Sequence, residues 1–172
     1  SNNFEDRDFE LFSEKGIDAF VERVDQGLTP LPELWTWHEP GTRYGQADWV
    51  DRIGHFAIAT GTYDDTPAGR SGKAYDAQHA DEYEVSHGFF YKSAGVRFVD
   101  GRRVFEDFNT FEISPLPKGK AANALTAFAV ETSDKFKEKS MTPEKRELLI
   151  KKHGDEYVKG LEADTERLGK AH

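Results

Sequence analysis

The 172-residue sequence contains no cysteine, a single methionine and no apolar run long enough to cross a membrane. The missing cysteine excludes a disulfide scaffold, a cysteine-ligated zinc site and a cysteine nucleophile. Positive charge is scarce relative to negative charge, since 23 Lys and Arg stand against 32 Asp and Glu, for a net charge of −9. This balance argues against the phosphate backbone of a nucleic acid as the main partner.

The single methionine is Met141, and the sequence starts at Ser1 rather than at an initiator. We therefore expect the chain to be either an autoprocessed product or the trimmed core of a longer protein. The length fits one domain. We expect a β-rich domain with an N-terminal helix over residues 1–130. A helical C-terminal extension over 131–172 would pack on this domain or lead to a removed tail.

The hydrophobic pattern changes period along the chain. Apolar residues at helical spacing predict a short amphipathic helix over 16–27. From 34 to 63 the period shifts toward two, which predicts strands, and 83–91 predicts another. Between them, the sequence DDTPAGRSG predicts a turn-rich loop over 64–72, followed by a short helix over 73–81.

The clearest local signal is Asp100-Gly101 between two β-prone runs, 96–99 and 102–105. Because both turn residues need a positive φ, Asp-Gly in this position predicts a type I′ hairpin. The second strand can continue to residue 113, where we expect prolines to end it. The alanine-rich stretch 121–130 is compatible with a helix or a strand. The fold class predicted is α+β and β-rich. The prolines expected to end that strand are Pro115 and Pro117.

The tail predicts helices with a narrow apolar stripe. Thr142-Pro143 is typical of a helix start, and Gly154-Asp155 of the boundary between two helices. The stripe consists of Val158, Leu161 and Leu168.

The sequence lacks the P-loop, the dinucleotide fingerprint, HExxH, the EF-hand loop and GxSxG, which weakens nucleotide, zincin, calcium and α/β-hydrolase interpretations. The remaining candidates are His38 in LWTWHEPG, Ser86 in VSHGF and Glu112 in FNTFEISP. A serine hydroxyl needs an adjacent base to become a nucleophile, and a neutral imidazole can take its proton near pH 7. A carboxylate on the other ring nitrogen would hold the tautomer.

Each candidate also has a structural interpretation. His38 can hydrogen-bond a loop, Ser86 can be a small strand residue beside an aromatic, and Glu112 can pair with Arg102 or Arg103 across the hairpin.

Three other histidines are rival bases: His55, His79 and His87. We expect His55 and His79 to be structural or surface residues. His87 follows Ser86 directly, and adjacent strand residues point to opposite faces, so its ring should not reach the Ser86 hydroxyl.

The order of five segments over residues 31–128 resembles the tailed-phage prohead (capsid maturation) protease family, which is related to herpesvirus assemblin. The segments are LPELWTWHEPGTRYG, DRIGHFAIATGTYDD, VSHGFFY, FNTFEISPLP and AANALTAF. The resemblance implies Ser86 as nucleophile, His38 as general base and Glu112 as the acidic third member. It also implies a mostly antiparallel β-barrel flanked by helices. The family usually has a strand before its histidine segment, where this sequence predicts a helix.

The resemblance further implies a serine endopeptidase that cleaves scaffold protein, major capsid protein and itself during capsid assembly. The location would be the bacterial host cytoplasm, inside the assembling prohead. We expect no cofactor, metal, nucleic acid or membrane, a possible homo-oligomer, and weak activity of the isolated domain. The alternative is a non-enzymatic capsid assembly or scaffold protein, suggested by the apolar stripe of the tail. A metal hydrolase is disfavoured because no ligand spacing appears.

Overall fold

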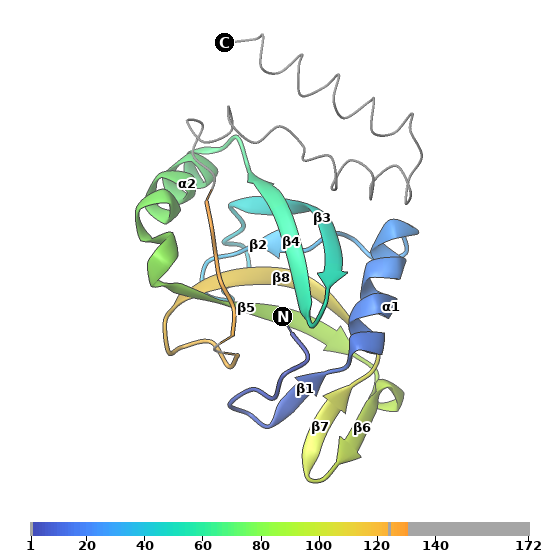
Figure 1. Cartoon of the computed structure of the whole chain (residues 1–172). Helices are drawn as coiled ribbons and strands as arrows, with labels where there is room; N and C mark the ends of the chain where they lie inside the picture. Colours follow the sequence, from blue (N-terminus) through green and yellow to red (C-terminus); the bar gives the residue numbers. More distant parts are fainter. Residues whose placement is uncertain (1, 124, 131–172) are drawn as a thin grey trace, which may run out of the picture. The chain divides into compact units, whose positions relative to one another are not determined.

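The structure is a computed structural model that describes residues 2–123 and 125–130. Contacts along the chain divide it into residues 1–130 and 131–172. The helices and the apolar stripe expected in the tail lie outside the described residues. The described part is a strand-rich α+β unit (Figure 1). Its elements are β1 (Glu10–Phe12), α1 (Glu14–Asp25), β2 (Glu33–Leu34), β3 (Gly45–Ile53), β4 (Phe56–Tyr63), α2 (Pro67–His79), β5 (Tyr83–Tyr91), β6 (Val96–Val99), β7 (Arg102–Phe105) and β8 (Phe108–Pro117).

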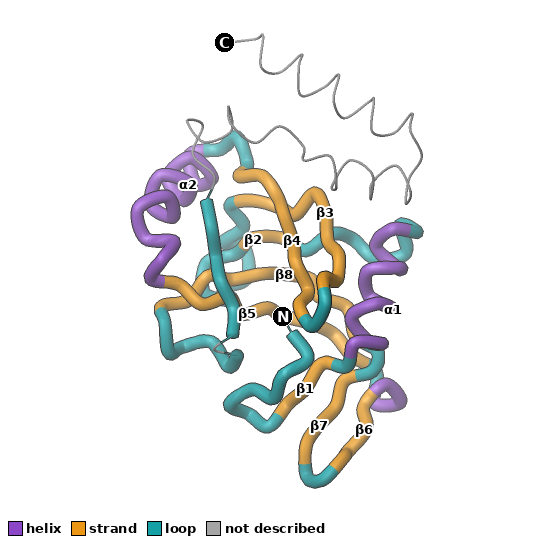
Figure 2. Tube along the Cα trace, viewed as in Figure 1, coloured by secondary structure: helices purple, strands orange, loops and turns teal. Residues whose placement is uncertain are grey.

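The strands form a five-stranded sheet, β4-β3-β2-β8-β5, and a three-stranded sheet, β1-β7-β6. The pairs β2/β8 and β1/β7 are parallel and the other pairs are antiparallel. The larger sheet curls as a half-barrel, with β4 and β5 at its two edges within the described residues (Figure 2). The predicted β-rich α+β class is therefore confirmed.

Helix α1 covers the predicted helix 16–27 but begins and ends two residues earlier. It begins early because the Ser13 side chain accepts a hydrogen bond from the Gly16 N–H at 3.0 Å and caps the first turn. Gly27, with a φ of 68°, follows its end. Gly16 allows a close approach, because a Cβ there would lie 2.8 Å from the Phe105 carbonyl oxygen.

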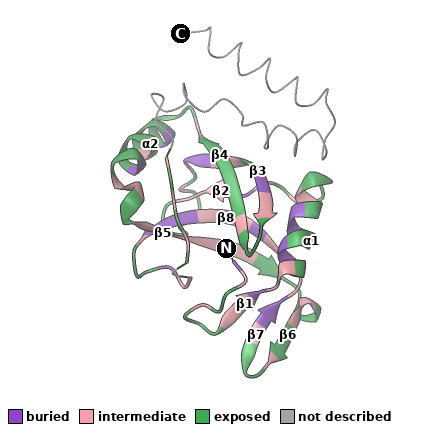
Figure 3. Ribbon diagram, viewed as in Figure 1, coloured by how far each residue is buried: buried purple, intermediate pink, exposed green. Residues whose placement is uncertain are grey.

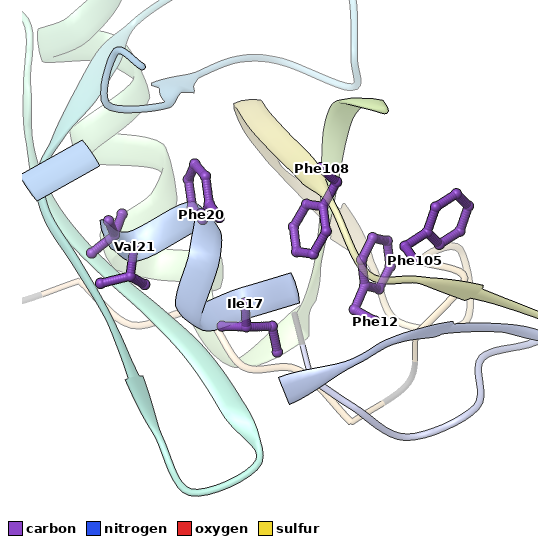
Figure 4. Close-up of a cluster of buried hydrophobic side chains, with 7 residues drawn as sticks. Phe12, Ile17, Phe20, Val21, Phe105 and Phe108 are labelled. Carbon is purple, nitrogen blue, oxygen red and sulfur yellow. The ribbon is translucent and has the colours of Figure 1, made fainter. Parts of the chain in front are cut away.

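The core lies where α1 meets β1, β7 and β8 (Figure 4). Phe12 on β1 is its centre: its ring stacks on Phe105 at 5.1 Å between centroids and meets Phe108 edge-on at 4.7 Å. By contrast, β4 is exposed along most of its length (Figure 3). The buried core residues are Phe12, Ile17, Phe20, Val21, Val50, Phe105 and Phe108.

Two predictions that rest on local signals are confirmed. Strand β5 spans the predicted residues 83–91. Strands β6 and β7 form the predicted hairpin, with φ values of 51° at Asp100 and 79° at Gly101, as a type I′ turn requires.

The predicted loop 64–72 is wrong from Pro67 onward, because α2 already begins there. The Thr66 side chain accepts a hydrogen bond from the Gly69 N–H at 3.0 Å, and Pro67 occupies the first helical position. These are helix-start signals inside a composition that resembles a loop. Gly69 is also required by packing, since a Cβ would lie 2.0 Å from the Asp64 carbonyl oxygen.

The strand pattern over 34–63 is interrupted. Strand β2 has only two residues, and turns and irregular backbone cover residues 35–44 before β3 begins. Gly41, with a φ of 83°, and the adjacent Pro40 break the extended backbone there.

The second hairpin strand does not continue to residue 113: β7 ends at Phe105, and β8 in the larger sheet begins at Phe108. Nor do the prolines end that strand, since Pro115 and Pro117 both lie within β8 and pair with β5. Strand β2 pairs only with Glu112 and Ile113. Beyond them no strand within the described residues pairs with that side of β8, and proline is tolerated where the N–H has no ladder partner.

The alanine-rich stretch forms neither helix nor strand in its described residues, 121–123 and 125–130. The buried Asn2 side chain binds this stretch instead: its amide donates to Asn123 Oδ1 at 3.0 Å and to the Leu125 carbonyl at 2.9 Å. Side-chain hydrogen bonds of this kind satisfy backbone groups outside regular structure.

Candidate active site

His38 lies in a tight turn that follows β2 and is anchored to β8. Trp37 and His38 have φ values of 53° and 61°, in the left-handed region that non-glycine residues rarely adopt. Such a conformation costs about 1–3 kcal/mol per residue and persists only where neighbouring contacts impose it. Two of these contacts come from β8: Trp35 N–H donates to the Ile113 carbonyl at 2.9 Å, and His38 N–H donates to Ser114 Oγ at 2.9 Å.

The anchored turn places the His38 ring against Glu112. Nδ1 of His38 lies 2.6 Å from Oε1 of Glu112, whose side chain is only 1% exposed, whereas that of His38 is 39% exposed. A carboxylate oxygen accepts, so the ring proton lies on Nδ1 and leaves Nε2 free for a second partner. The hydrogen bond and the charge of Glu112 raise the pKa of His38 above its ordinary 6.5, while partial burial acts in the opposite direction.

Ser114 holds the other oxygen of the same carboxylate. Its hydroxyl donates to Glu112 Oε2 at 2.7 Å, and the Ser114 residue is fully buried. Both Glu112 oxygens therefore have donors, as a buried carboxylate requires. The chain of contacts runs from the His38 ring through Glu112 to Ser114 and back to the His38 backbone.

Ser86 lies on the neighbouring strand, on the same face of the sheet. In the β5–β8 register Ser86 is opposite Ser114, and Gly88 is opposite Glu112. Residues directly opposite in an antiparallel pair share a face, with Cβ atoms about 4.5–5.5 Å apart. Within the described residues, however, no hydrogen bond joins the Ser86 hydroxyl to the His38 ring. The structure thus brings His38 and Glu112 into contact and places Ser86 beside them.

Gly88 makes room for the Glu112 side chain. A Cβ at this position would lie 2.5 Å from Glu112 Oε1 and 2.6 Å from the Phe111 ring. The register shifts next to it, between Gly88 and Phe89, as in a β-bulge. Glycine in the Ser-x-Gly segment is therefore explained by the close passage of Glu112 across β5.

Ser86 also borders a pocket of about 200 Å³ beside β5. Because Phe12, His87 and Phe89 line it, the pocket lies on the core face of β5, opposite to the face that bears His38 and Glu112. Its walls come from the N-terminal segment, β5 and the stretch after β8: Asp6, Asp8, Glu10, Phe12, Val85, Ser86, His87, Phe89, Ala122, Asn123 and Thr126.

His87 does not belong to this cluster. Its Nδ1 lies 2.9 Å from Thr110 Oγ1, and its ring meets Phe12 edge-on at 4.8 Å. Burial lowers the pKa of His87, and the positive charge of His38 acts in the same direction. The ring thus faces the aromatic core, as its position next to Ser86 on a strand predicts.

The other two rival bases lie outside this cluster and each contacts a carboxylate of its own. His55 contacts Glu14 at 2.8 Å, and His79 contacts Glu82 at 3.2 Å.

The arginine pairing considered for Glu112 is wrong. Arg103 pairs with Glu10 and Arg102 pairs with Glu5. Both arginines lie on β7, in the smaller sheet, whereas Glu112 lies on β8 in the larger sheet.

Sequence reasoning missed Ser114. Its signal is simple in retrospect: Ser114 stands two residues after Glu112 on one strand, and residues i and i+2 share a face. The segment FNTFEISP contained this information, but only the fold shows that the shared face meets the His38 turn.

Comparison of the chain with protein-family models, curated proteins and solved structures gives no match. Over residues 2–123 and 125–130, no group of three or more His, Asp or Glu side chains is arranged to hold a metal ion. In the same part of the chain, no helix is long and apolar enough to span a bilayer.

Proposed function

We propose that the chain is a serine hydrolase of the endopeptidase type. One observation carries this proposal: the 2.6 Å contact between His38 Nδ1 and Glu112 Oε1, on the sheet face that also bears Ser86. An imidazole oriented by a buried carboxylate is the base that a serine nucleophile requires. The raised pKa of His38 follows from this same contact.

In the proposed reaction, the Ser86 hydroxyl attacks the scissile carbonyl while His38 Nε2 takes its proton. Glu112 holds Nδ1 protonated and stabilises the imidazolium. The imidazolium then gives its proton to the leaving amine as the C–N bond breaks, which leaves an acyl-enzyme on Ser86. A water molecule, deprotonated by His38, then attacks the ester; as the C–O bond to Ser86 breaks, the imidazolium returns its proton to Ser86 Oγ and the acid product leaves. Ser86 must approach His38 when substrate binds, and such contacts are often long in unliganded sites.

Within this class we propose a phage prohead protease that cleaves scaffold and major capsid protein, and itself, inside the assembling prohead. The ordered resemblance over residues 31–128 supports this choice, and the curled, strand-rich sheet is compatible with an assemblin-like fold. Strand β5 is an edge of its sheet in the described unit, and an extended peptide can pair with a sheet edge; next to Ser86, the Val85 N–H of this edge already donates to Thr126 Oγ1 at 2.7 Å. The nucleophile of the proposed reaction lies on that strand.

The test is labelling with a fluorophosphonate probe, followed by mass spectrometry of the modified peptide. The wild-type chain should carry the label on Ser86, and Ser86→Ala should lose both the label and cleavage of scaffold protein, by at least about 10³-fold. Ser93→Ala is the matched control, since Ser93 lies on the same chain just beyond β5. A wild-type chain that supports capsid assembly without labelling Ser86 would favour the non-enzymatic scaffold protein.

A further inference from the structure

We propose that Ser114 is a positioning residue that locks the His38–Glu112 pair into one geometry. This inference deepens the proposed function, because the pair matters for catalysis only if His38 is the general base. Ser114 contacts neither Ser86 nor the free side of the imidazole ring through any hydrogen bond within the described residues. It acts through the two residues that do the chemistry.

The Ser114 hydroxyl makes two hydrogen bonds of opposite sense. It donates to Glu112 Oε2 at 2.7 Å and accepts from the His38 N–H at 2.9 Å. Because Ser114 is fully buried, water does not compete for either bond. One side chain thus ties the backbone of the base to the carboxylate that orients its ring.

The two bonds restrain the two movements that would misplace the imidazole. The bond to Oε2 stops the carboxylate from turning away, so Oε1 stays directed at His38 Nδ1. The bond to the backbone holds His38 in its left-handed conformation, with a φ of 61°. A left-handed non-glycine residue is retained only where its surroundings impose it.

Ser114 is not a second candidate nucleophile. Its proton points at a carboxylate rather than at Nε2 of a histidine, and its side chain has no access to solvent. By contrast, Ser86 is half-buried rather than fully buried. The two serines face each other across β5 and β8 but differ in what their hydroxyls can reach.

The test compares Ser114→Ala with the wild-type full chain by NMR titration of the His38 ring. We expect the pKa of His38 to fall toward its ordinary 6.5, because a loosened turn weakens the Glu112 hydrogen bond that raises it. On a cleavable peptide, kcat should fall by about 10–100-fold with KM nearly unchanged, as for a misplaced catalytic group. Ser114→Thr, which keeps the hydroxyl, should retain the raised pKa.

Thr110→Val is the matched control. Thr110 is another buried hydroxyl on β8, but it binds His87 on the core face. Its loss should leave the pKa of His38 unchanged. An unchanged His38 pKa in Ser114→Ala, or an equal fall in Thr110→Val, would overturn the positioning role.

Two readouts keep this inference separate from the proposed function. The pKa of His38 reports whether Ser114 positions Glu112 against its ring, even if the wild-type chain cleaves nothing. In that case only the peptidase proposal fails. If Ser114→Ala does not fold, amide exchange in the wild-type chain decides. The His38 N–H should exchange slowly, and exchange as fast as that of an exposed turn would overturn its bond to Ser114.

Discussion

The two faces of the β5–β8 pair place two histidines in opposite electrostatic environments. On one face, His38 contacts a buried carboxylate and keeps part of its ring in solvent, and its pKa is raised. On the other face, His87 packs among aromatic rings with a neutral hydroxyl as partner, and its pKa is lowered. The same strand pair thus places a carboxylate-paired histidine on one face and a core histidine on the other.

The difference shows that the partner, rather than the residue type, decides what a histidine can do. A carboxylate favours the imidazolium, whereas an apolar environment without an opposite charge favours the neutral ring. Alternation along β5 ensures that Ser86 and His87 face different partners. The predictions below test this assignment of roles, beginning with the largest expected effect.

Replacing His38 should mainly lower activity, whereas replacing His87 should mainly lower stability. His38→Gln should lower kcat/KM by about 10²–10⁴-fold, the typical contribution of a general base. His87→Phe should leave kcat/KM within about tenfold but lower the free energy of unfolding by about 1–3 kcal/mol, because the buried Thr110 hydroxyl loses its partner. Peptide cleavage and denaturant unfolding measure the two effects. An equal loss of activity in both variants would contradict the separation of the two faces.

The aromatic residues of the core face should contribute more to the free energy of unfolding than an exposed aromatic residue. Phe12 is 6% exposed and packs against Phe105 and Phe108, so Phe12→Ala should lower the free energy of unfolding by about 3–5 kcal/mol. Phe98, which is 73% exposed, is the matched control, and Phe98→Ala should change it by no more than about 0.5 kcal/mol. Equal effects in urea unfolding would mean that the aromatic cluster is not the core.

The smallest expected effect is a displacement of the pH profile. General-base catalysis needs neutral His38, so kcat/KM should rise with pH through a midpoint above 6.5. Glu112→Gln removes the charge and the charged hydrogen bond that raise the pKa of His38, so the midpoint should move down toward 6.5. Initial rates at saturating and limiting substrate across pH 5–9 measure this. A midpoint that stays in place would show that another group controls the profile.

The two histidines should also affect stability with opposite signs. The raised pKa of His38 means that its pairing with Glu112 stabilises the fold fully below pH 6.5 and is lost as pH rises through the raised value. The lowered pKa of His87 means the reverse: its contribution is present above pH 6.5 and is lost as pH falls. Unfolding of the two histidine variants at several pH values is the control for the activity profile.

Local sequence signals predicted the elements that depend on neighbours in the chain. The amphipathic helix, strand β5 and the Asp100-Gly101 hairpin follow from periodicity and turn chemistry, which act over a few residues. The same signals placed a helix over 73–81 but missed the first six residues of α2, where a capping threonine outweighed a loop-like composition. They also failed in β8, where Pro115 and Pro117 are tolerated because β2 pairs with only two of its residues.

In the candidate site too, local sequence signals determined part of the arrangement and tertiary contacts the rest. The sequence by itself determined which side chains were available, and the alternation of β5 already separated Ser86 from His87. Only the tertiary structure decided that the turn after β2 meets β8, so that His38 and Glu112, 74 residues apart in the chain, lie 2.6 Å from each other. It also decided that Ser114 joins them. The physical reason is that a strand pattern specifies which residues share a face, whereas the pairing of distant strands specifies what that face contacts.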